Sequence, residues 1–333
     1  MAVRIQGEVC RSRSPKRAVR ARRPRTWAVV AACVSMAAVM AGCDKSGPSA
    51  TAGTGAGAGR LRVVAAENFW GSIASQLGGE RVAVSSIIVN PDTDPHSYEP
   101  TAADARTIAG ARLAIVNGIG YDNWAPKLLA ASPAEGGGGR VVLNVGEALG
   151  LGDGDNPHQW YSPASVRRIV GEIVADYERL DPAGAEYYAA QEQAFETKSL
   201  ARYDELRAQI RARYAGTPVG YSESIFRPLG EDLGLRLLTP YGFAKAIAEG
   251  GEVSAQDKRT VDRQAERREI RVWVFNSQNV TPDVQRINEI ARARGIPIAT
   301  VTETLAPAGD TFEQWQVAQL EGLMKALRAG TGR

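Results

Sequence analysis

Two histidines are the residues best suited to chemistry in this chain. They are the only histidines among its 333 residues, and each follows a proline in a short polar stretch, His96 in Asp-Pro-His-Ser-Tyr and His158 in Asn-Pro-His-Gln-Trp. Because proline has a restricted φ angle, the backbone is stiff just before each ring. Imidazole is the commonest protein ligand for zinc and other first-row metals. Two rigidly presented imidazoles therefore indicate a metal site.

Further ligands are needed, because two nitrogen atoms alone do not hold a divalent ion tightly. The three cysteines all lie within the first 43 residues, so a site in the rest of the chain must use nitrogen and oxygen donors. Glu223 and Glu303 are each the acidic residue of a short polar turn that follows a predicted strand. We expect these two carboxylates to complete the site. The alternative for each one is a surface or helix-capping glutamate.

Other familiar sites do not fit the sequence. Aspartates near each histidine suggest calcium, but an EF-hand loop begun at Asp92 or Asp153 lacks the glycine at its sixth position and the acid at its twelfth. The chain has no His-Glu-x-x-His motif and no Walker loop, and the part after residue 43 has no cysteine nucleophile. No basic patch indicates nucleic-acid binding.

The elements that must position these residues follow an α/β pattern. Runs of apolar and β-branched residues predict eight strands, separated by segments with helical spacing: 61–66, 81–89, 112–117, 140–145, 217–221, 235–238, 271–275 and 296–301. His96, His158, Glu223 and Glu303 all come after strands of this set. Open parallel sheets bind ligands at the carboxyl ends of their strands. We therefore expect two lobes with mostly parallel sheets and a ligand cleft between them.

Long helices are predicted between the two sets of strands. Residues 163–180 have amphipathic spacing, and residues 183–214 carry large apolar side chains at helical intervals without an internal glycine or proline. The second segment is long enough to be a rigid strut between the lobes. Its aromatic residues indicate core packing, and a partner surface is the alternative.

The N-terminal segment is typical of an export signal. The first 26 residues hold nine basic residues and one acid, and an apolar run from Trp27 to Ala41 follows, which is too short to span a bilayer. Met-Ala-Gly-Cys at residues 40–43 resembles the lipobox of bacterial lipoproteins, in which the signal is cut before the cysteine and Cys43 is lipidated. An ordinary secretory signal is the alternative, and export by the Sec or the twin-arginine route stays open. Without residues 1–43 the net charge changes from +3 to about −5.

The two Pro-His motifs, Asn-Gly-Ile-Gly at residues 117–120 and the long tyrosine-bearing helix resemble the zinc- and manganese-binding lipoproteins of bacterial ABC metal importers. The similarity covers residues 60 to 330 and implies two α/β lobes joined by one long helix, with the ion held by two side chains from each lobe. The matching ligand positions are His96, His158, Glu223 and Glu303. Many family members have a third histidine at the position of Glu223 and an aspartate at that of Glu303.

The donor set bears on the metal. Two histidines with two carboxylates are harder than three histidines, which moves the site toward manganese or iron(II), whereas zinc binds such sites more tightly than manganese does. Zinc is favoured and manganese comes next. Asn276 and Gln278 follow another strand and are expected to orient a carboxylate or an imidazole, or else to satisfy turn backbone. We expect Trp160, Tyr121 and Trp124 to wall the cleft.

These observations predict an extracytoplasmic, lipid-anchored and monomeric receptor that does no chemistry of its own. It captures one divalent transition metal ion and delivers it to an ABC permease driven by a separate ATPase. The expected organisation is a signal peptide at 1–43, a flexible tether at 44–60, an N-terminal metal-binding lobe at 61–182, a linking helix at 183–214 and a C-terminal metal-binding lobe at 215–333. A secreted zinc-dependent hydrolase is the alternative, and a receptor for an organic solute is a third reading.

Overall fold

Two parallel sheets of four strands form the frame of the protein. The computed structural model describes residues 59–333 apart from 94, 96–97 and 135–138. The first sheet has the order β2-β1-β3-β4 and the second has the order β6-β5-β7-β8, so the two lobes repeat one topology. All eight strands fall on the segments predicted from the sequence: β1 Leu61–Glu67, β2 Val82–Ile88, β3 Leu113–Val116, β4 Val141–Asn144, β5 Pro218–Tyr221, β6 Arg236–Leu237, β7 Val272–Asn276 and β8 Ile298–Val301.

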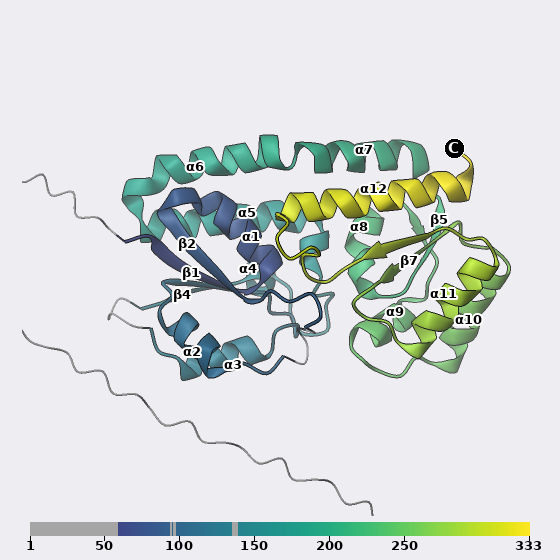
Figure 1. The fold of residues 1–333 in the computed structure, drawn as a ribbon, viewed down its shortest axis with the longest axis horizontal. Helices are drawn as coiled ribbons and strands as arrows, with labels where there is room; N and C mark the ends of the chain where they lie inside the picture. Colours follow the sequence, from purple (N-terminus) through teal and green to yellow (C-terminus); the bar gives the residue numbers. More distant parts are fainter. Residues whose placement is uncertain (1–58, 94, 96–97, 135–138) are drawn as a thin grey trace, which may run out of the picture. The chain divides into compact units, whose positions relative to one another are not determined.

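Helices cover both faces of each sheet, as buried parallel strands require. In the first lobe α1 and α5 lie on one side of the sheet and α2 and α3 on the other (Figure 1). In the second lobe α9, α10 and α11 pack on one face, and α8 belongs to the other side. The bounds are α1 Asn68–Gly78, α2 Ala102–Ala109, α3 Trp124–Ala131, α4 Val145–Leu149, α5 Pro163–Leu180, α8 Arg227–Asp232, α9 Tyr241–Ala248, α10 Ala255–Glu266 and α11 Pro282–Ala293.

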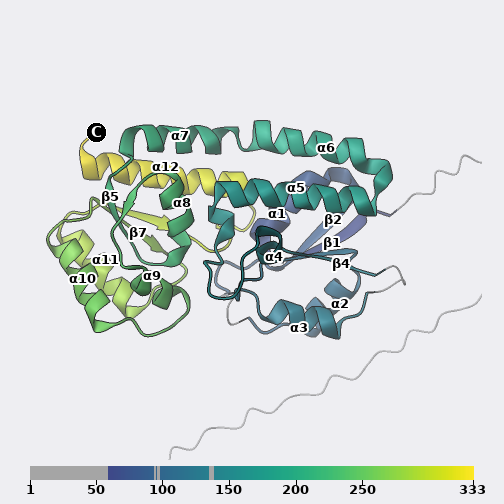
Figure 2. The ribbon, with the colours of Figure 1, turned by 180° about the vertical axis from the view of Figure 1, so that it is seen from behind.

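The segment between the lobes is helical but not one uninterrupted α-helix. It consists of α6 (Ala185–Ala194), a π-helical turn at Phe195–Ser199 and α7 (Ala201–Tyr214), and it passes along both lobes (Figure 2). The π turn is closed by the bond from the Leu200 amide to the Phe195 carbonyl, at 2.9 Å. An i→i+5 turn brings residues five apart onto one face. Phe195 and Leu200, which are five residues apart, are both buried.

A C-terminal helix that was not predicted from the sequence also contacts both lobes. This is α12 (Phe312–Thr331), which packs against α7, β7 and β8. At its beginning the Phe312 amide donates to Ser72 Oγ of α1 at 2.9 Å. One hydrophobic cluster extends from the first sheet under α5, α6, α7 and α12 to the second sheet, so the two lobes share a core. None of the helices in the described part of the chain combines the length and apolar composition needed to cross a membrane.

Candidate metal centre

His158 is completely buried, and its ring is oriented by Asn156. The Asn156 side chain donates from Nδ2 to the Ser224 carbonyl at 2.8 Å, which turns its Oδ1 toward the histidine. That oxygen accepts the His158 backbone amide at 3.1 Å and lies 2.8 Å from Nδ1 of the ring. Because a carbonyl oxygen can only accept, Nδ1 carries a hydrogen, which leaves Nε2 as the nitrogen that can bind a metal when the ring is neutral.

Two buried carboxylates meet this imidazole from the second lobe. Glu223 follows β5, and its Oε1 lies 3.6 Å from His158 Nε2. Glu303 follows β8. Asn276, the last residue of β7, donates from Nδ2 to Glu223 Oε2 and to Glu303 Oε1, each at 2.9 Å. One amide group therefore holds both carboxylates side by side. Asn276 was expected to orient a carboxylate or an imidazole or else to satisfy turn backbone; it contacts both carboxylates, and its role in metal binding stays a prediction.

One ligand atom from each of His158, Glu223 and Glu303 lies within 4.8 Å of the other two. Ligand atoms bound tetrahedrally at about 2.0–2.2 Å from a zinc ion are roughly 3.4 Å apart. The three groups are thus close to coordination distance. His96, the fourth expected ligand, lies outside the described residues, as does Cys43.

Gln278 holds backbone rather than a carboxylate or an imidazole. Its Oε1 accepts the amides of Glu303 and Thr304, at 2.6 and 3.1 Å. Its Nε2 donates to the Pro91 carbonyl at 2.6 Å. Pro91 belongs to the segment that follows β2 and leads to the expected position of His96. Gln278 thus connects the turn that carries Glu303 to the first lobe. Of the two roles expected for Gln278, these contacts correspond to the second, in which it satisfies backbone groups of a turn.

Tyr121 reaches the site from the first lobe. Its hydroxyl donates to Glu303 Oε2 at 2.8 Å. Burial and the neighbouring Glu303 raise the pKa of the Tyr121 hydroxyl well above its ordinary value, so it remains a neutral donor. Tyr121 was predicted only to line the cleft, and its hydrogen bond to the expected ligand Glu303 was not predicted. No local sequence pattern marks that bond, because it joins residues 182 positions apart.

The loop that presents Tyr121 is strained. Gly118, Ile119 and Gly120 all have positive φ angles, and at a β-branched residue such as Ile119 this conformation costs on the order of 1–3 kcal/mol. The Asp122 carboxylate closes the loop by accepting the amides of Asn117 and Gly118 at 2.7 and 2.8 Å. Strain retained at one loop indicates that the position of Tyr121 matters to the site.

A second pair of acidic groups is buried behind this loop. Glu67, the last residue of β1, is completely buried next to Asp122. Burial and the nearby Asp122 raise the pKa of the Glu67 carboxyl well above its ordinary value. Burial also raises the pKa of Asp122, although the two backbone amides that it accepts act in the opposite direction. These shifts favour the protonated form of Glu67 beside Asp122. This pair was not predicted from the sequence.

Aromatic rings cover the imidazole. The Trp160 ring centroid lies 5.2 Å from that of His158, and Phe69 stacks on Trp160 at 4.0 Å. Trp160 therefore walls the site as expected. Trp124 instead belongs to a separate apolar cluster, where it packs edge-on against Tyr98. The covering rings exclude water, which strengthens electrostatic interactions among the buried donors.

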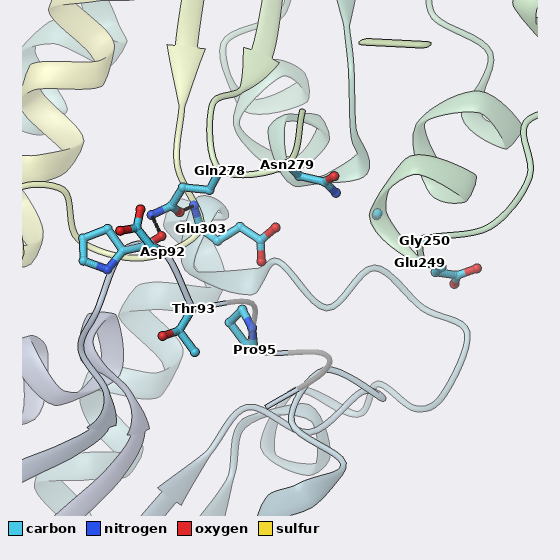
Figure 3. Close-up of a pocket in the computed structure, with 10 residues that line it drawn as sticks. Asp92, Thr93, Pro95, Glu249, Gly250, Gln278, Asn279 and Glu303 are labelled. Carbon is cyan, nitrogen blue, oxygen red and sulfur yellow. Dashed lines mark hydrogen bonds between the residues drawn. The ribbon is translucent and has the colours of Figure 1, made fainter. Parts of the chain in front are cut away.

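A cavity of about 390 Å³ between the lobes reaches this site. It is lined by Asp92 and Thr93 from the first lobe, by Glu249 and Gly250 at the end of α9, and by Glu303. Figure 3 shows the Glu303 carboxylate directed into the space between Thr93 and Pro95 of the first lobe and Glu249 of the second.

Comparisons with known proteins give a consistent result. The sequence profile of the family described as ZnuA, zinc-uptake complex component A periplasmic, matches residues 63–326. The manganese-binding lipoprotein MntA of Halalkalibacterium halodurans is 30% identical over 209 residues, which are 60% of this chain and 65% of that protein. The high-affinity zinc uptake system protein ZnuA of Bacillus subtilis is 25% identical over 178 residues, 48% of this chain and 53% of that protein. The chain thus spans less than two thirds of the length of these two relatives.

Among solved structures, the manganese-bound periplasmic metal-binding protein of Candidatus Liberibacter asiaticus has the same fold. Its TM-score is 0.66 and its identity is 19%, and the match covers 80% of this chain and all of that one.

Proposed function

We propose that this protein captures a divalent transition metal ion outside the cytoplasm and delivers it to the permease of an ABC importer. The chain belongs to the zinc-uptake component A family, whose members are metal-binding transport proteins and not enzymes. The observation that carries this proposal is the meeting of His158, Glu223 and Glu303 in one buried site at the seam between the lobes. Buried carboxylates are unfavourable unless a cation or hydrogen-bond donors compensate their charge.

In this proposal four side chains bind the ion: His158, Glu223, Glu303 and His96. Asn276 keeps the two carboxylates adjacent, and Gln278 secures the turn of Glu303. The Nε2 lone pair of His158, directed toward Glu223, supplies the nitrogen donor. Such groups around ligands align them and tune their affinity.

Zinc is the favoured ion in this proposal, and manganese comes next. Two imidazoles and two carboxylates suit both ions, and zinc ranks above manganese in the Irving–Williams order. The relatives named above are described as binding manganese in one case and taking up zinc in the other.

The proposed receptor is monomeric and anchored to the cell membrane through a lipidated Cys43, and a permease and its ATPase are its partners. The name of the relative MntA, a lipoprotein, supports the anchor. The hydrolase alternative has no support among the relatives. The same holds for a receptor that binds an organic solute.

The decisive experiment counts ions. We expect native mass spectrometry of the metal-stripped protein to show one ion per chain after addition of Zn²⁺, and Mn²⁺ to bind with lower affinity in direct competition. Glu303→Gln removes one ligand charge with little change in shape and should weaken zinc binding by more than about 100-fold, beyond the usual loss for groups that only support ligands. Glu266→Gln, the same change at an exposed residue of α10, is the control. Equal affinities in the two variants would refute the proposed site.

A further inference from the structure

Within the described part of the chain, two cavities open between the lobes close to the proposed metal centre, and either could admit the ion. The first is the cavity of about 390 Å³ that reaches Glu303. The second, of about 270 Å³, is lined by Pro157 and Ser224, which are the sequence neighbours of His158 and Glu223. Residues Ala248 and Glu249 at the end of α9 border both cavities.

Only the first cavity is lined by one of the three described ligands. Glu303 retains 6% of its exposure, whereas Glu223 retains 1% and His158 none. Glu303 is also the ligand whose carboxylate is directed into the first cavity in Figure 3. An ion that arrives through this cavity therefore meets Glu303 before it meets the two more deeply buried groups.

The charges of the two cavities differ. The described lining of the first contains three acids, Asp92, Glu249 and Glu303, and no basic residue. The second contains Asp155, Glu249 and the cationic Lys245. Lys245 lies 3.6 Å from Glu249 and donates to the Gly154 carbonyl at 3.2 Å, so its ammonium group sits at that passage between the lobes. A cleft lined by charges of one sign concentrates the opposite ion, and a fixed cation weakens this effect.

We propose that the metal ion enters and leaves through the first cavity, where Asp92 attracts it and Glu303 is the first of the three described ligands to receive it. This inference rests on the proposed function of the site. It assigns Asp92 a role in the rate of capture, although Asp92 is exposed and is not among the proposed ligands. The second cavity does not conduct the ion.

A matched pair of charge removals tests the route. Asp92→Asn takes one negative charge from the first cavity, and Asp155→Asn takes one from the second while keeping an oxygen that can accept the Gly152 amide. Binding of Zn²⁺ and of Mn²⁺ is followed by stopped-flow tryptophan fluorescence, since Trp160 lies against His158. We expect Asp92→Asn to lower the association rate constant about threefold at low ionic strength, with an unchanged dissociation rate constant. Asp155→Asn should match the wild type.

Salt provides an internal check. The difference between the two variants should disappear near 1 M salt, where the Debye length is only about 3 Å. A second pair introduces a cation: Thr93→Lys in the first cavity should slow association about tenfold at low ionic strength, whereas Asn123→Lys in the second should not. Circular dichroism and unfolding of the metal-free variants establish that they fold.

The outcomes separate this inference from the proposed function. If the wild type binds one ion and the Asp155 and Asn123 variants are the slow ones, the ion uses the second cavity and the inference is wrong. If all four variants associate at the wild-type rate, Asp92 has no role in capture and the inference is equally wrong. If the wild type itself binds no metal, the proposed function fails instead.

Discussion

The Asn276 side chain offers the sharpest test of how the site is organised. Its single amide nitrogen donates to Glu223 and to Glu303 at 2.9 Å, and its Oδ1 accepts the Gln278 amide at 3.0 Å. Asn276→Ala removes all three contacts. It leaves two buried carboxylates next to each other without their shared donor.

The expected loss of zinc affinity in Asn276→Ala depends on which of these hydrogen bonds persist when the metal is bound. Glu223 turns Oε1 toward His158 and Oε2 toward Asn276, so its bond to the amide is compatible with a metal on the first oxygen. A hydrogen bond to a charged group contributes about 1.5–3 kcal/mol, and the variant loses this support in both the metal-free and the metal-bound protein. Affinity therefore falls only by the loss of alignment, which is roughly 10–100-fold for groups that support metal ligands.

Chelator competition at fixed pH and ionic strength measures this change, and urea unfolding of the metal-free protein measures the loss of stability, which we expect to be about 2 kcal/mol. Asn279→Ala is the matched control, since its amide lies in the same turn and donates instead to the Ile247 carbonyl. A zinc affinity of Asn276→Ala within twofold of the control would refute the reasoning.

Three further predictions concern other supporting groups. Asn156→Ala should weaken zinc binding about tenfold because the His158 ring loses its orientation, and Asn156→Asp, which keeps the accepting oxygen, should recover most of it in the same titration. Gln278→Ala should weaken zinc affinity roughly tenfold by releasing the turn of Glu303, and unchanged affinity would show that the Gln278 contacts do not matter to binding. Glu67→Gln should remove one component of the pH dependence of stability. In the folded wild type the raised pKa of Glu67 favours its protonated form, whereas in the unfolded chain its pKa is about 4.3. The free energy of unfolding therefore falls as pH rises above about 4.3, by up to about 1.4 kcal/mol per pH unit. Urea unfolding between pH 5 and pH 8 should show the variant gaining on the wild type, and parallel profiles would contradict the assignment.

The strands and the long amphipathic helices could be predicted because their signals are local. The eight predicted strand segments match β1 to β8, and residues 163–180 form α5 with the predicted bounds. The spacing of apolar residues could not reveal the π turn at Phe195–Ser199. Two apolar residues five positions apart do not fit the 3.6-residue period of an α-helix, and the sequence does not show whether the helix changes its geometry there. The helix α12 was missed, although its capping box at Thr311 and Gln314 is a local signal that could have marked its beginning.

The types of donor, and their positions just after strands, are properties of the sequence alone. Two Pro-His motifs and two glutamates suffice to predict a site of nitrogen and oxygen ligands, because parallel strands end at one edge of their sheet. Only the tertiary structure decides which atoms meet. The bond from Tyr121 to Glu303 depends on how the two lobes pack together, whereas the bonds from Asn276 to both carboxylates depend on how the ends of β5, β7 and β8 come together within the second lobe. These contacts of less than 3 Å join residues far apart in sequence, so no local pattern sets them.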